Sequence, residues 1–110
     1  MNWQTLSTGS SKQYPSAARW FEVHLSSQTT DDVTRYRLVM TGKSAIPGEV
    51  DRIRTETTTS AHAVVDFLAM GERGRRYIPK ISRKILHEAA DIDRNIGDAL
   101  DDFDMLMSPS

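Results

Sequence analysis

Three residues near the end of the chain are of types that bind metal ions, at a spacing that a helix could use. His87, Glu88 and Asp91 fall within about one turn of a predicted helix, so an imidazole and a carboxylate share one face. The helical zinc motif of metalloproteases requires a second histidine where Asp91 stands, and His24 and His62 have no spacing relation to it. We therefore interpret these residues as solvated helix positions, and we expect neither a metal nor any other cofactor.

Gly42, Lys43 and Ser44 follow a predicted strand and are the residue types that end a phosphate-binding loop. That loop requires a glycine five residues earlier, where this sequence has Arg37, and Pro47 follows too soon for a helix to open as the phosphate site demands. A hairpin turn is the better interpretation. The serines and threonines lie mainly in predicted turns and caps, without a base and an orienting group beside them. We predict that the protein is not an enzyme and has no small-molecule substrate.

Arginines and one aromatic residue gather on the outward face of the predicted sheet, and a basic linker follows Gly71. Aromatic rings stack on bases and guanidinium groups bind phosphates, which is how an open sheet binds single-stranded nucleic acid. Glu22 and Glu56 alternate with these arginines, so cross-strand ion pairs on a solvated sheet explain the same pattern. The candidate nucleic-acid face comprises Trp20, Arg35, Arg37, Arg52, Arg54, Arg73, Arg75 and Arg76.

Charge is segregated along the C-terminal part of the chain. Bases without any acid lie between Arg73 and Lys84, whereas acids dominate from Glu88 to Asp104. Carboxylates spaced along a helix can imitate a phosphate backbone and occupy a partner's nucleic-acid groove, or they can simply keep an outward face soluble. The candidate acidic interaction face comprises Asp91, Asp98, Asp101, Asp102 and Asp104.

An apolar pattern without interruption predicts one long amphipathic helix over residues 79–107. At about 1.5 Å per residue this helix would be about 40 Å long and would extend beyond a domain of this size. We therefore predict that it pairs with a second copy, parallel or antiparallel, in a homodimer. Gly97 predicts either a kink or the close approach of a second backbone. The predicted dimer or partner residues are Ile85, Ile92, Ile96, Leu100, Phe103 and Met107.

The elements before this helix follow from shorter patterns. Alternation predicts strands over residues 19–26 and 33–41, joined by a loop longer than two residues, and β-branched residues predict a third strand over 50–58. A helix capped by Ser60 is predicted over 61–70. The predicted fold class is α+β, with a small three-stranded antiparallel sheet, a short helix and the long C-terminal helix. Residues 1–16 are predicted to be a flexible N-terminal arm, and 17–110 a single domain.

Composition sets the broad class of protein. The chain has 110 residues, a net charge of −1 and no cysteine, which fits one domain in a reducing compartment. Its start does not have the pattern of a signal peptide and no apolar run approaches the length of a membrane span, so we expect a cytoplasmic protein without a membrane partner.

The predicted function is that of a non-enzymatic inhibitor or adaptor. It would bind a macromolecular, nucleic-acid-processing partner, for instance as a phage- or plasmid-encoded antagonist of host defence. The alternative is a nucleic-acid-binding protein that uses the sheet face and the basic linker.

Overall fold

A computed structural model describes residues 2–12, 19–44, 47–70 and 78–107. Four strands are followed by three helices. They are β1 (Gln4–Lys12), β2 (Arg19–Thr30), β3 (Val33–Ser44), β4 (Arg52–Thr58), α1 (Ala61–Met70), α2 (Ile78–Ile92) and α3 (Arg94–Met107). None of the described helices is long and apolar enough to cross a membrane.

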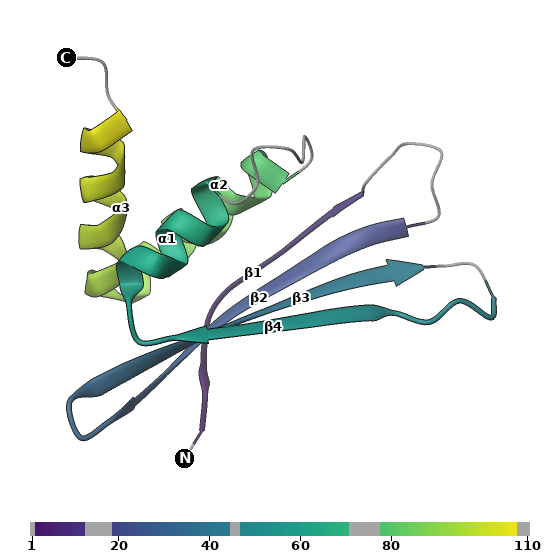
Figure 1. Cartoon of the computed structure of the whole chain (residues 1–110), viewed down its shortest axis with the longest axis horizontal. Helices are drawn as coiled ribbons and strands as arrows, with labels where there is room; N and C mark the ends of the chain where they lie inside the picture. Colours follow the sequence, from purple (N-terminus) through teal and green to yellow (C-terminus); the bar gives the residue numbers. More distant parts are fainter. Residues whose placement is uncertain (1, 13–18, 45–46, 71–77, 108–110) are drawn as a thin grey trace.

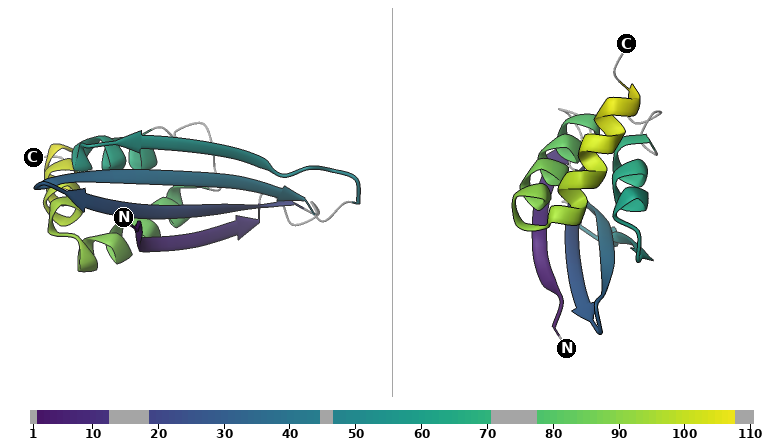
Figure 2. Two further views of the ribbon diagram at one scale, coloured as in Figure 1. Left: turned by 90° about the horizontal axis from the view of Figure 1, so that it is seen from below. Right: turned by 90° about the vertical axis from the view of Figure 1, so that its left-hand side faces the viewer.

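The strands form one antiparallel sheet in the order β1-β2-β3-β4, so neighbours in the chain are neighbours in space. The helices lie on one face of this sheet, with α1 against β3 and β4 and α2 against β1 (Figure 1). The left view of Figure 2 looks onto the opposite face, which no helix of the described chain covers. The α+β class with an antiparallel sheet is therefore confirmed.

The sheet has four strands where the sequence predicts three, because β1 lies in the stretch predicted to be an arm. β1 pairs with β2 from Gln4 to Lys12, with one bulge between Thr5 and Ser7. Its sequence is rich in serine and threonine, and Leu6, 4% exposed, is its main contribution to the core. A strand this polar is held by backbone hydrogen bonds to its neighbour, which a hydrophobic pattern does not reveal. Residue 1 and residues 13–16 of the predicted arm lie outside the described residues.

β2 and β3 are joined by a tight turn of two residues, Asp31 and Asp32, and the longer loop predicted here is wrong. Both aspartates have positive φ, 51° and 64°, as the mirror-image hairpin turns require. Asp and Asn adopt this conformation more readily than other residues with a Cβ. The pairing therefore continues to Thr30 opposite Val33, and the hairpin carries two carboxylates at its tip.

The core lies between the helices and the sheet. Alternate residues of β2 and β3 point into it as predicted, since Val23 is 1%, Leu25 0% and Leu38 4% exposed. α2 packs closely on β1 at Gly9, where an added Cβ would lie 2.9 Å from the side chain of Ile81. The helices contribute Val64, Val65, Leu68, Ile81, Ile85, Leu86, Ala89, Ile96, Ala99, Leu100 and Phe103.

The prediction of a single long C-terminal helix is wrong, because the chain bends at Asp93 and forms two helices, α2 and α3. The Asp93 N–H still donates to the Ala89 carbonyl of α2 at 2.8 Å, while the Asp93 carbonyl already accepts from the Gly97 N–H of α3 at 3.1 Å. The Asp93 carboxylate also accepts from the Ile96 N–H at 3.2 Å, as an N-cap does. The apolar spacing is the same for one straight helix as for two joined at a capped corner, so periodicity did not reveal the bend.

This bend folds the apolar stripe into the protein's own core. Ile85 and Ile96 are both 0% exposed, and Leu100 and Phe103 are buried with them. These four predicted dimer residues are therefore not available to a second copy of the folded chain. The other two, Ile92 and Met107, are 55% and 49% exposed.

Candidate functional site

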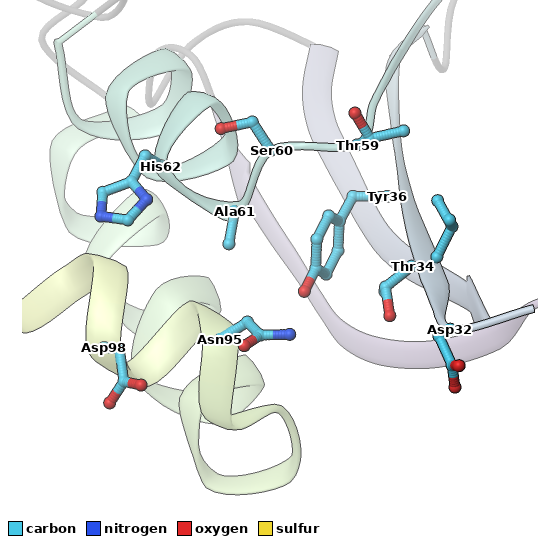
Figure 3. Close-up of a pocket in the computed structure, with 10 residues that line it drawn as sticks. Asp32, Thr34, Tyr36, Thr59, Ser60, Ala61, His62, Asn95 and Asp98 are labelled. Carbon is cyan, nitrogen blue, oxygen red and sulfur yellow. The ribbon is translucent and has the colours of Figure 1, made fainter.

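An open pocket of about 620 Å³ lies where the tip of the β2–β3 hairpin faces the first turns of α1 and α3 (Figure 3). Three elements that are distant in the sequence meet here. The pocket is lined by Asp32, Val33, Thr34, Tyr36, Thr59, Ser60, Ala61, His62, Asn95 and Asp98.

Two capped helix starts border this pocket. Ser60 is the N-cap of α1, as predicted, because its Oγ accepts from the Ala63 N–H at 3.1 Å. Asp93 caps α3 in the same way. The caps mark where α1 and α3 begin. Asn95 and Asp98 of α3 and His62 of α1 lie around the same opening (Figure 3).

Tyr36 joins the sheet to the helix corner beside the pocket. It is 2% exposed, and its hydroxyl donates to both carboxylate oxygens of Asp93 at 3.1 Å. Burial raises the pKa of Tyr36 to about 12, and the Asp93 carboxylate adds to the rise, whereas a hydrogen bond with Asn95 acts in the opposite direction. The phenol is therefore neutral at physiological pH, and it acts as a structural donor rather than as an acid or base.

The charges around the pocket are mainly negative. Its ionisable lining groups, apart from the neutral Tyr36, are Asp32, Asp98 and His62. The His62 Nε2 lies within hydrogen-bond distance of a carboxylate oxygen of Asp102, at 2.8 Å. Neither Asp32 nor Asp98 forms an ion pair with another residue in the described part of the chain. Two aspartates thus line this opening, and neither has a basic partner among the described residues.

No family model, curated protein or solved structure matches this chain. The chemistry of the pocket is therefore inferred from its own residues. Carboxylates with hydroxyl and amide oxygens nearby suit an ammonium or guanidinium group, which donates several hydrogen bonds and accepts none.

The residues with metal-ligand spacing in the sequence do not come together as a metal site. Over the described ranges, no group of three or more His, Asp and Glu side chains could hold a metal ion. Glu88 instead accepts a hydrogen bond from the Ser7 hydroxyl at 3.1 Å and pairs with Lys84 at 3.5 Å. His87 is exposed on α2.

The structure divides the predicted acidic interaction face. Asp102 contacts His62 at 2.8 Å, and Asp104 forms an ion pair with Arg83 at 2.9 Å, so both already have partners within the chain. Asp98 lines the pocket. The remaining two, Asp91 and Asp101, are exposed on α2 and α3.

The register of β4 divides the predicted nucleic-acid arginines between the two faces of the sheet. Arg37 lies opposite Thr57 on the open face, whereas Arg54 lies opposite the buried Met40 on the helix-covered face. Arg52 shares the face of Arg54, so the prediction that these two join the other sheet arginines is wrong. The error comes from the weak alternation of β4. The side chains of Trp20, Arg73, Arg75 and Arg76 lie outside the described part of the structure.

The aromatic contacts of the sheet arginines were not predicted. The Arg37 guanidinium lies 4.4 Å from the ring centroid of Trp3, a residue that the sequence places in the arm. Arg54 lies 5.5 Å from the ring centroid of Phe67 on α1. Arg35 remains exposed on the open face.

Sequence reasoning found Asp98 of the pocket and missed Asp32, Tyr36 and Asn95. The adjacent aspartates at the hairpin carried a usable signal, because Asp between two alternating segments favours a tight turn. The alternation of β3 accounts for the buried position of Tyr36, but its contact with Asp93 and the position of Asn95 depend on the corner at Asp93, which no local pattern reveals.

Proposed function

We propose that the protein is a non-enzymatic interaction module, an inhibitor or adaptor, that binds a basic segment of a macromolecular partner in its acidic pocket. The observation that carries this proposal is that Asp32 and Asp98 line the same opening, from the hairpin tip and from α3, and have no basic partner in the described chain. Nucleic-acid-processing proteins present arginine- and lysine-rich grooves, so they are the class of partner that this charge fits.

The surroundings of the pocket support a protein segment as the ligand. Beyond the opening, α3 carries further acidic positions, since Asp101 and Asp102 follow Asp98 at helical spacing and are exposed. Past them, Met105 and Leu106 are 76% and 83% exposed. Exposed apolar residues beside a charged surface are typical of protein-binding sites.

The chemistry of the site favours binding over catalysis. The His62–Asp102 pair is exposed at the surface, and the Ser60 hydroxyl already accepts the capping hydrogen bond of α1. In the described chain, no hydroxyl nucleophile is hydrogen-bonded to His62. The Tyr36 hydroxyl donates its hydrogen bond to the Asp93 carboxylate.

The test is a binding titration with a short peptide of alternating arginine and glycine, and with the matched glutamate peptide. The double variant Asp32→Asn and Asp98→Asn should weaken binding of the arginine peptide by about tenfold or more, because two carboxylate contacts are lost. Asn also suits the positive φ of residue 32, so the hairpin turn is retained. Asp51→Asn, at an exposed position before the opposite end of β4, is the control with the same type of charge change.

Equal binding by the double variant and the wild type would refute the pocket as the binding site. Equal binding of the arginine and glutamate peptides would refute the proposed charge preference. Asp51→Asn removes one negative charge and the double variant removes two, so a loss of binding free energy from Asp51→Asn that is half or more of the double variant's would reduce the effect to net charge.

A second candidate function is single-stranded nucleic-acid binding by the open sheet face. The observation in its favour is that Arg35 and Arg37 lie on a face that no described helix covers. If this face binds phosphates, Arg35→Ala and Arg37→Ala should weaken oligonucleotide binding and reduce its salt dependence. Arg52→Ala, on the other face, is then the internal control.

A further inference from the structure

We propose that the outer edge of β4, with which no described strand pairs, joins the same edge of a second copy, so that two sheets form one continuous antiparallel sheet. This interface differs from the helix pairing predicted from the sequence, whose residues are largely buried in the core. It is also independent of the acidic pocket, which lies beyond the C-terminal end of β4.

The two edges of the sheet differ in how they are protected. β1 carries a bulge between Thr5 and Ser7, a device that disfavours edge pairing. β4 pairs with β3 in an unbroken register from Arg52 to Thr58 and has no proline, so its outer edge is a regular template. Near this edge, Ile53 is 68% exposed, so apolar surface remains to be buried.

The charges of β4 are complementary to themselves. Arg54 and Glu56 lie on the same face of the strand, and within one chain they already form an ion pair at 2.9 Å. In an antiparallel pair centred on Thr55, Arg54 of each copy lies opposite Glu56 of the other. The same pairing places Ile53 opposite Thr57 on the open face.

Neighbouring registers each place like charges directly opposite each other. A pair centred on residue 54 places two Arg54 side chains opposite each other, although it also sets Arg52 opposite Glu56, and a pair centred on residue 56 places two Glu56 side chains opposite each other. The charge pattern therefore selects Thr55 as the centre. The second copy then has its helices on the same face, because residues that lie opposite each other in antiparallel strands point to the same side.

Sedimentation velocity over a range from micromolar to about 1 mM tests the pairing on the full chain. The wild type should dimerise, and Glu56→Arg or Arg54→Glu alone should weaken the dimer by about tenfold or more, because each opposes like charges at two symmetry-related positions. Mixing these two variants should form a heterodimer, since every arginine then faces a glutamate. Thr8→Arg on the exposed face of β1 is the control and should leave the dimer unchanged.

A wild type that stays monomeric over this range would overturn the proposal. Single variants that dimerise as strongly as the wild type would also overturn it, as would a mixture that stays monomeric. Circular dichroism of each variant establishes that it is folded. Because binding of the arginine peptide does not depend on these residues, failure here leaves the pocket proposal standing.

Discussion

The corner at Asp93 determines where the pocket lies, and its contribution to stability follows from its contacts. Asp93→Ala removes the N-cap of α3, which costs about 1 kcal/mol. It also leaves the buried Tyr36 hydroxyl without its carboxylate partner, which costs a further ~1–3 kcal/mol. We expect the free energy of unfolding to fall by about 2–4 kcal/mol, a large fraction of the stability of a small domain.

Denaturant unfolding in a double-mutant cycle separates these two contributions. Asp93→Asn keeps an oxygen that can cap α3 and should cost less than about 1 kcal/mol. In a Tyr36→Phe background the phenol is absent, so Asp93→Ala should cost only the cap, about 1 kcal/mol. Equal costs of Asp93→Ala with and without the Tyr36 hydroxyl would refute the coupling, and equal costs of the Ala and Asn variants would refute the cap.

Three further predictions concern the helices and the buried phenol. Ile96→Asp should cost about 3 kcal/mol or more in chemical denaturation because Ile96 is 0% exposed, whereas Ile92→Asp, at 55% exposure, should cost less than about 1 kcal/mol; similar costs would contradict the bend. Gly97→Ala should raise the melting temperature, with a gain of up to ~1 kcal/mol, because the new Cβ meets Ala90 at an ordinary contact of 3.7 Å; a fall would show that the two helices pack more tightly than this. The free energy of unfolding should decline between pH 10 and about 12, because the folded state keeps the Tyr36 proton above the ordinary pKa of 10 and the unfolded state does not. In urea unfolding, Tyr36→Phe should flatten this decline. An unchanged dependence of the unfolding free energy on pH would contradict the burial of the phenol.

The sequence predicted the parts of the fold that depend on local patterns. Alternation located β2 and β3 because Val23, Leu25 and Leu38 carry the core on one face. The hydroxyl of Ser60 marked the start of α1. These signals need no knowledge of distant residues, which is why they could be recognised in a single sequence.

The errors arose where order depends on residues that are distant in the chain. β1 is a strand through its pairing with β2, although its own residues are polar. The corner at Asp93 is held by Tyr36, which is 57 positions away in the sequence. The pocket exists because of this corner, so its lining also depends on residues distant in the chain. Asp98 could be predicted as part of an acidic face, but Asn95 could not be assigned a role.

A two-dimensional NMR titration of the labelled protein with the arginine–glycine peptide tests most directly whether the acidic pocket is the binding site. The proposed function predicts that the largest shifts gather at Asp32, Ser60, Asn95 and Asp98, around the opening between the hairpin and the two helix starts. It also predicts that these shifts are lost in the Asp32→Asn and Asp98→Asn double variant. Shifts confined to the open sheet face, or no saturable shifts at all, would contradict it.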